Sequence, residues 1–327
     1  MKTLLTAAVV ALTATVATAR DHIQVAGSST VLPYASIVAE AFGENFDFPT
    51  PVVESGGSSA GLKRFCDGTG ENTIDIANAS RPIKDSERET CAANGIDSIT
   101  EVRIGYDGIV FATDKNLKGL ETLNEGQLYL AMSKNYDYTS WKQVDSALPD
   151  VRIMVYIPGT KHGTREVFEE KVLLEGCKAV GDYDKFLAES GDKKAATKKC
   201  SEVDNMRASD IDGDYTETLA RIGSEPTAMG VFGLAFYYNN TDKINVSTIN
   251  GVVPSQETIA DGTYPVSRPL FFYVKDAHIG VIPGLAEFVQ FFVADEIAGP
   301  TGPLAEYGLV ADPKLAETQE KVNALGN

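Results

Sequence analysis

Short, largely apolar runs alternate with helical segments along most of the chain. The runs at residues 23–26, 51–54, 74–77 and 153–157 are typical of buried strands. Each is followed by a loop and then by a predicted helix, at residues 31–42, 60–66, 85–94 and 166–174. This alternation predicts βαβ units with mainly parallel sheets, in which ligands bind at the carboxyl ends of the strands.

The chain is long enough for two domains. Its 327 residues correspond to about two domains at ~150 residues each. No Pro/Ser-rich linker separates two halves, so we expect strand-like segments to pass between the lobes. The candidates for these crossings are residues 102–112 and 265–274.

The first 19 residues have the pattern of a secretion signal. Lys2 precedes an apolar run over 4–16, which ends in the small-residue sequence Ala17-Thr18-Ala19. We therefore predict cleavage near Ala19 and a mature start at Arg20; the alternative is an N-terminal helix of the fold. No later apolar stretch reaches the ~18 residues of a membrane span, so the mature protein is expected to be soluble.

Export favours disulfides, because an exported protein meets an oxidising compartment. The four cysteines allow three connectivities, of which we favour the local pairs Cys66–Cys91 and Cys177–Cys200. Each pair would close a loop of roughly 25 residues, worth about 3 kcal/mol. No C-x-x-C motif occurs and the three histidines are scattered, so no metal or other cofactor is expected.

The net charge excludes some partners. Lys and Arg total 29 against 46 Asp and Glu, a balance of −17. Nucleic acids and anionic membranes both attract basic proteins, so neither is an expected partner. A small ligand is not excluded, since a site can have its own local field.

Three of the loops share one chemistry. The loops at residues 27–30, 55–59 and 158–164 carry Gly with Ser or Thr directly before a predicted helix. A helix N-terminus presents unpaired N–H groups, glycine permits close approach, and a hydroxyl adds a donor. Together they predict a site for an oxyanion, with Arg81 as a charged donor at the end of the third strand. Taken singly, each loop also fits a plain helix cap.

The sequence lacks the two common motifs of nucleotide-binding loops. No G-x-x-x-x-G-K-[ST] sequence occurs, and no G-x-G-x-x-G follows a strand, so nucleotide binding is disfavoured. A secreted hydrolase using Ser58, His162 and Asp107 stays open, although no G-x-S-x-G motif supports it.

Over essentially the whole mature chain, the sequence resembles the PstS family, the phosphate-binding proteins of ABC phosphate importers. The resemblance rests on five segments in order: VAGSSTVLP (25–33), ESGGSSAG (54–61), DIANASRPI (75–83), Gly163-Thr164 and YPVSRPL (264–270). It implies an α/β fold of the type II periplasmic-binding kind, with mainly parallel sheets flanked by helices, two crossovers and phosphate in the cleft. We expect lobe I to comprise residues 20–106 plus 268–327, and lobe II residues 107–267.

The resemblance also implies ligand contacts. It places the Thr30 hydroxyl, the Val31 N–H and Ser58 on phosphate oxygens from the first lobe. From the second lobe it places the Gly163 N–H and Thr164. Ser29 and Ser80 are further candidates in the same loops.

Two departures from the family pattern matter. Well-studied members have Asp where this chain has Arg81, and that Asp accepts the phosphate proton. They also have Arg where Pro158 stands, and Ser where His162 stands. A carboxylate in the site repels sulfate, which carries no proton, so its loss would weaken selectivity. Asp107 is the replacement candidate; the alternative is an exposed turn carboxylate.

Three further residues complete the candidate set. His162 could donate to phosphate in place of the serine. Arg207 either faces the cleft or pairs with Asp210. Arg268, at the second crossing, is expected to be structural.

The function that follows is periplasmic binding of inorganic phosphate and delivery to the permease of an ABC importer by hinge closure. We expect a monomer and no catalysis. The alternatives are the same fold binding sulfate, arsenate or molybdate, an extracellular adhesin of this fold, and the hydrolase.

Overall fold

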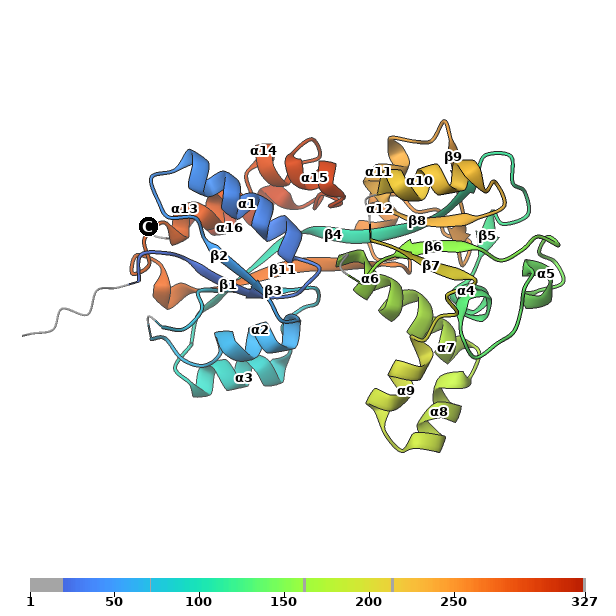
Figure 1. The fold of residues 1–327 in the computed structure, drawn as a ribbon. Coiled ribbons are helices and arrows are strands. Elements are labelled where there is room, and N and C mark those ends of the chain that lie inside the picture. The colour runs from blue at the N-terminus through green and yellow to red at the C-terminus, as the bar shows by residue number, and fades with distance from the viewer. Residues whose placement is uncertain (1–19, 71, 161–162, 213–214, 326–327) are drawn as a thin grey trace, which may run out of the picture.

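Two α/β lobes lie side by side, joined by two long strands. The computed structural model describes residues 20–70, 72–160, 163–212 and 215–325, so the predicted signal peptide lies outside it. The joining strands, β4 (Ile99–Asp114) and β11 (Ser267–Lys275), pair antiparallel across the junction (Figure 1). The predicted two-lobed α/β fold with two crossing strands is confirmed.

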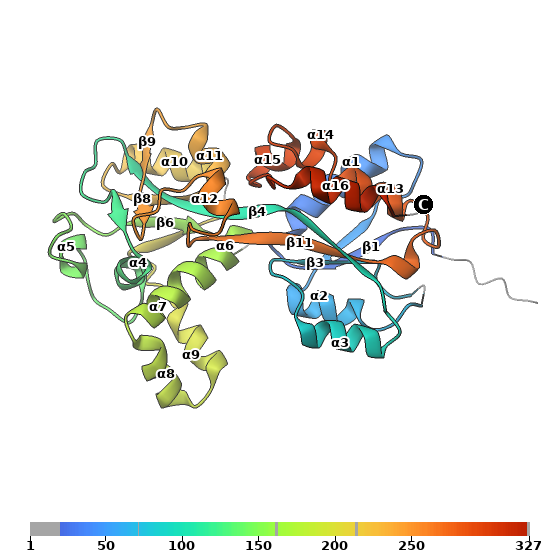
Figure 2. The same ribbon diagram turned by 180° about the vertical axis from the view of Figure 1, so that it is seen from behind.

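In the first lobe, three short strands extend the sheet outward from β11. They are parallel to one another and follow in the order β3 (Ile76–Ala79), β1 (Gln24–Gly27) and β2 (Val52–Ser55). Helices cover both faces of this sheet (Figures 1 and 2). One face carries α1 (Leu32–Asn45), α13 (Leu285–Phe292) and α16 (Leu315–Asn323), with α14 (Asp295–Ala298) and α15 (Pro303–Tyr307) beside them; the other carries α2 (Ser58–Phe65) and α3 (Asp85–Ala93).

Apolar burial on both faces holds the first lobe together. On the α1 face, Ala35, Val38 and Phe42 recur at helical spacing and pack with residues of α13. On the opposite face, Leu62 and Phe65 of α2 are fully buried. The strand ends between these layers are therefore fixed in position.

The second lobe continues the sheet beyond β4. The strands follow in the order β8 (Met229–Gly233), β6 (Val155–Pro158) and β7 (Ala208–Ile211), with β9 (Ile244–Val246) also paired to β4. A separate parallel pair joins β5 (Thr122–Leu123) to β10 (Thr248–Ile249). The helices are α4 (Glu125–Met132), α5 (Trp141–Val144), α6 (Gly163–Val167), α7 (Glu175–Ala179), α8 (Asp182–Ser190), α9 (Lys193–Cys200), α10 (Tyr215–Ser224), α11 (Leu234–Tyr238) and α12 (Gln256–Ala260).

The predicted helix over 166–174 takes a different form. The structure has α6, a π-helical segment (Phe168–Leu174) and α7 in one continuous run. Apolar periodicity of 3.6 residues cannot distinguish an i→i+5 turn from an α-helical one, and π turns often occur near functional sites.

Two properties bear on function. None of the helices in the described residues combines the length and the apolar character that a membrane span requires. In the same residues, no three His, Cys, Asp or Glu side chains group in a way that could hold a metal ion.

The cysteines form the two sequence-local pairs. Cys66 at the end of α2 is bonded to Cys91 in α3, and Cys177 in α7 to Cys200 in α9. The first bond closes a loop with a sequence separation of 25 residues, the second one of 23. Each therefore restricts the unfolded chain to a similar extent.

Replacing Cys66 and Cys91 together by Ala should lower the free energy of unfolding by about 3 kcal/mol, because the unfolded chain regains the freedom of that loop. Urea denaturation without reductant measures the loss. The Cys177→Ala/Cys200→Ala variant should lose a similar amount. A loss below about 1 kcal/mol in both would contradict the assignment of these bonds as stabilising.

Candidate functional site

Three strand ends of the first lobe bring hydroxyl groups to the junction with the second lobe. Thr30 follows β1, Ser58 follows β2 and Ser80 follows β3, and all three are buried. The hydroxyl oxygens of Ser58 and Ser80 lie 3.2 Å apart, and the Ser80 N–H donates to Ser58 Oγ at 3.1 Å. Ser58 and Ser80 therefore form one hydrogen-bonded pair rather than two separate helix caps.

Close approach of α2 to β1 depends on two glycines. Gly27 has a φ of 144°, and a Cβ there would meet the Asn78 carbonyl oxygen at 2.1 Å. A Cβ on Gly61 would lie only 2.4 Å from the Gly27 Cα. Only glycine fits either position, so the two residues let the N-terminal turn of α2 lie beside the loop that holds Thr30.

The two crossing strands add a carboxylate and a guanidinium to the site. Asp107 on β4 is the register partner of Arg268 on β11, and the two residues are 1% and 4% exposed. Among the described residues, neither Asp107 Oδ2 nor Arg268 Nε has a hydrogen-bond partner. Buried polar atoms are normally paired, so two unpaired atoms on adjacent strands are a specific sign that a polar ligand completes this site.

The buried position changes the acidity of Asp107. Burial raises its pKa to about 6, nearby Arg268 acts in the opposite direction, and Glu166 adds to the rise. The carboxylate is therefore mainly ionised at neutral pH yet takes up a proton easily. Such a group can accept a hydrogen bond from an acidic ligand.

Arg268 links the two lobes through its guanidinium. Its Nη2 donates to Thr30 Oγ1 at 2.5 Å and lies 3.4 Å from Glu166 Oε2. Its Nη1 donates to Glu170 Oε2 at 3.1 Å. The hydroxyls of Ser29 and Thr30 also donate to Glu166 Oε2, at 3.1 and 3.0 Å. One carboxylate of the second lobe therefore contacts three donors around the junction.

The second lobe contributes the start of α6. Gly163 is the first residue of that helix, and the Tyr215 hydroxyl donates to Thr164 Oγ1 at 3.4 Å. Arg165 is anchored away from the junction by the Pro158 carbonyl and the carboxylates of Asp210 and Glu169. Burial raises the pKa of the Tyr215 phenol, so it stays protonated at neutral pH.

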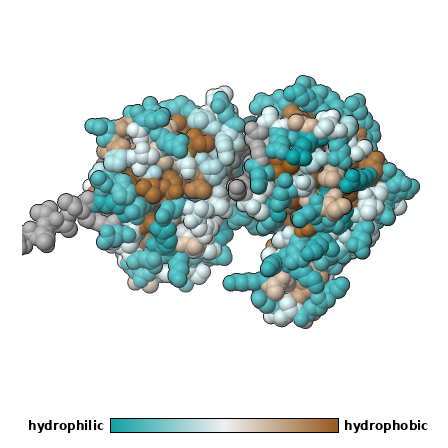
Figure 3. All heavy atoms as spheres, in the orientation of Figure 1, coloured by the Kyte–Doolittle hydropathy of each residue, from teal (hydrophilic) through white to brown (hydrophobic). Residues whose placement is uncertain are grey.

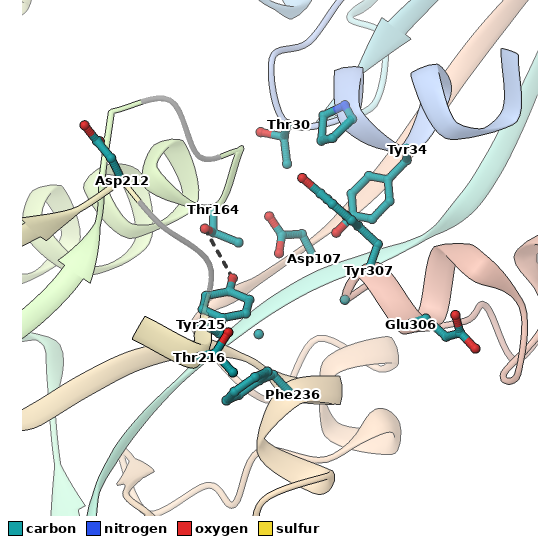
Figure 4. Close-up of a pocket in the computed structure, with 13 residues that line it drawn as sticks. Thr30, Tyr34, Asp107, Thr164, Asp212, Tyr215, Thr216, Phe236, Glu306 and Tyr307 are labelled. Atoms are coloured by element: carbon teal, nitrogen blue, oxygen red, sulfur yellow. Dashed lines mark hydrogen bonds between the residues drawn. The ribbon is translucent and has the colours of Figure 1, made fainter. Parts of the chain in front are cut away.

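Two cavities open at the junction, and the space-filling view shows the lobes separated by a notch below it (Figure 3). The first, of about 380 Å³, is lined by Thr30, Asp107 and Thr164 together with aromatic residues of both lobes (Figure 4). The second, of about 480 Å³, is lined by Ser58, Ser80, Arg81, Glu166 and Arg268 among others. Thr30 of the first cavity contacts Glu166 and Arg268 of the second. The arrangement can bind an anion through hydroxyls, N–H groups and a guanidinium, with a carboxylate to accept its proton.

Sequence and structure comparisons agree with this chemistry. A family model described as a PBP superfamily domain matches residues 12–296. The phosphate-binding protein PstS of Staphylococcus haemolyticus is 30% identical over 302 residues, covering 90% of this chain and 82% of that protein. The chain belongs to the PstS family of phosphate-binding proteins.

Solved structures support the same assignment. A possible phosphate-binding protein from Planctomyces limnophilus is 26% identical, with a TM-score of 0.71 over 93% of this chain and 97% of that one. A putative phosphate ABC transporter substrate-binding protein with bound phosphate, from Clostridium perfringens, is 25% identical, with a TM-score of 0.52 over 89% and 99%. The expected type II periplasmic-binding fold is confirmed.

Most residues expected from the PstS resemblance gather at the junction. Thr30, Ser58, Ser80, Asp107 and Thr164 line the two cavities, and Ser29 reaches the junction through Glu166. Val31 and Gly163 stand at the starts of α1 and α6. His162 lies outside the described residues. Asp107 is buried, so its alternative as an exposed turn carboxylate is wrong.

Arg81 lines the larger cavity but is already engaged. Its guanidinium forms a two-bond pair with Glu87, at 2.8 and 2.9 Å, and donates to Ser59 Oγ. A partly exposed, paired arginine at the cavity wall is available to a ligand only on its remaining donors.

For Arg207, neither predicted role holds. Its guanidinium donates to the backbone carbonyls of Ala131, Ser133 and Tyr136 and to Asp204. Its expected partner, Asp210, instead pairs with Arg165. These contacts hold the Arg207 guanidinium against the end of α4 and the segment after it, and Arg207 lines neither of the two cavities.

The sequence expectations missed two residues of the site. Arg268 was expected to be structural, and Glu166 was read only as part of a helix. Both lie at the junction because β11 and α6 come together with Thr30, across sequence separations of 238 and 136 residues. The feature of the sequence that could have identified Arg268 as a site residue was its place on a predicted crossing strand.

Asp107→Asn should stabilise the ligand-free protein. The pKa of Asp107 is raised from 3.8 to about 6, so ionisation costs the folded state up to about 3 kcal/mol above pH 6. This cost shrinks as the pH falls from about 6 toward 4, where the folded protein keeps the proton. Urea denaturation at pH 5 and pH 8 should therefore show a larger advantage of the variant at pH 8.

The matched control is Asp212→Asn, which removes an exposed carboxylate from the same cavity. It should change stability little at either pH. An equal gain for both variants, or a gain for Asp107→Asn that does not change with pH, would contradict the raised pKa.

Proposed function

We propose that the junction cleft binds inorganic phosphate reversibly and that the protein delivers it to the membrane subunits of an ABC importer. The observation that carries this proposal is the adjacent pair on the crossing strands, Asp107 and Arg268, each with an unpaired buried polar atom. Phosphate fits such a pair because its oxygens accept from the guanidinium while its remaining proton can go to the carboxylate.

The other contacts follow from the positions of the loops. Thr30, the Val31 N–H and Ser58 bind from the first lobe, and the Gly163 N–H and Thr164 from the second. Ser29, Ser80, Arg81 and His162 surround the ligand as secondary contacts. Helix N-termini on both sides supply unpaired N–H groups and a positive dipole end.

Binding in this form requires the lobes to move relative to each other. We propose hinge points within β4 and β11, so that residues 20–106 plus 268–327 and residues 107–267 close as two units. Ligand in the cleft then stabilises the closed form, as in other two-lobed binding proteins. The closed monomer is the form that the permease recognises, after export to the periplasm and removal of residues 1–19.

We propose no catalytic step. The Ser58 hydroxyl is engaged with Ser80, and the chain's relatives are named as binding proteins. A hydrolase would need a base aligned with that hydroxyl, whereas a binding site needs only fixed donors and acceptors.

Asp107 should also set selectivity. Sulfate is similar in shape to phosphate but has no proton to share, so an ionised Asp107 repels it. Calorimetry on protein that has been unfolded and refolded to remove bound ligand should give one-to-one phosphate binding and no sulfate heat. In Asp107→Asn, the ratio of phosphate to sulfate affinity should fall about 10- to 100-fold, the value of one charge-assisted hydrogen bond.

Asp212→Asn is again the matched control and should keep the wild-type ratio. Wild-type protein that binds neither anion would overturn the phosphate assignment. Wild-type protein that binds both equally would remove the selectivity role of Asp107 and favour a general oxyanion receptor.

A further inference from the structure

The Glu166 carboxylate occupies the groups that phosphate would use. Its Oε2 accepts from the Thr30 hydroxyl at 3.0 Å and from the Ser29 hydroxyl at 3.1 Å, and lies 3.4 Å from Arg268 Nη2. A carboxylate bound by two hydroxyls and a guanidinium is held much as an oxyanion ligand would be.

The two hydroxyls cannot serve both anions. Ser29 and Thr30 each have one O–H donor, and both donors point to Glu166. The second role of Thr30 Oγ1 is as an acceptor from Arg268 Nη2. Phosphate can take the Thr30 proton only if Glu166 gives it up, so the two anions compete for the same donor.

The negative charges around Arg268 also make Glu166 and phosphate compete. Three carboxylates lie near Arg268. Asp107 is opposite it on the neighbouring strand β4, and Glu166 and Glu170 form ion pairs with it. Arg81, a cation that lines the same cavity as Arg268, is paired with Glu87. A phosphate dianion added to this group meets strong repulsion unless one carboxylate moves away.

Exposure and contacts together indicate which carboxylate leaves. The side chains of Glu166 and Glu170 are 44% and 49% exposed, whereas that of Arg268 is 4% exposed. Of the two glutamates, Glu166 is the one that accepts from Ser29 and Thr30, so it is the one that phosphate displaces from these hydroxyls. Glu166 can rotate into water at little cost, while Asp107 and Arg268 cannot. The guanidinium then passes from the carboxylate to the incoming anion.

We propose that Glu166 is an internal competitor of phosphate, which holds the binding hydroxyls and Arg268 in the ligand-free protein and is displaced when phosphate binds. This inference rests on the proposed function. It assigns to Glu166 the role of setting the affinity: the apparent dissociation constant rises by the reciprocal of the fraction of molecules in which Glu166 is displaced.

The test uses Glu166→Gln, which keeps the size of the side chain but removes its charge. Stripped protein is titrated with inorganic phosphate, and association and dissociation rates are followed by stopped-flow tyrosine fluorescence. We expect at least tenfold tighter binding, with most of the gain in a faster association rate and little change in dissociation.

Glu169→Gln is the matched control, since Glu169 lies on the same continuous helix but pairs with Arg165. It removes the same charge and should leave phosphate binding unchanged. Circular dichroism checks that both variants fold, and Glu166→Ala replaces Glu166→Gln if that variant does not.

Unchanged or weaker phosphate binding in the Glu166 variant would overturn the inference. Weaker binding with faster dissociation would show instead that Glu166 holds the liganded cleft shut. These outcomes are separate from failure of the proposed function, in which wild-type protein itself binds no phosphate.

Discussion

The pairing of β4 with β11 is the constraint on which the site depends. It places Asp107 beside Arg268 where the chain crosses between the lobes, and it buries both side chains. Burial of two unlike charges with one atom of each left unpaired is unfavourable for the ligand-free protein. A protonated oxyanion relieves this cost, because it offers acceptors to the guanidinium and a donor to the carboxylate. In the proposed function, the strands that join the lobes therefore also carry the groups that recognise phosphate.

The rest of the molecule holds donors around this pair. Apolar layers on both sheet faces fix the strand ends, and Gly27 with Gly61 lets α2 approach the loop that carries Thr30. The second lobe brings α6, which supplies both Thr164 and the carboxylate of Glu166. Each lobe alone presents only part of a ligand shell. In the proposed function, the full binding energy is available only when the lobes are together, which couples occupancy of the cleft to its conformation.

Local patterns predicted the parts of the site that lie at strand ends. Thr30, Ser58 and Ser80 follow apolar runs, and parallel strands bring such ends to one edge. The cysteine pairs were predictable because the two members of each are close in sequence, at separations of 25 and 23 residues. Arg268 and Glu166 were not, because their contacts join segments more than 130 residues apart. For Arg207, the sequence left open a place in the cleft or a pair with Asp210. Its donors go instead to backbone carbonyls near the end of α4, and such contacts leave no pattern in the sequence.

The most direct test is a crystal structure of the refolded, ligand-free protein after soaking in phosphate. We predict phosphate at the junction, with its oxygens within hydrogen-bond distance of Thr30 Oγ1 and the Arg268 guanidinium, and with Asp107 Oδ2 accepting its proton. Phosphate bound at another place, or bound at the junction with Asp107 Oδ2 still unpaired, would contradict the account.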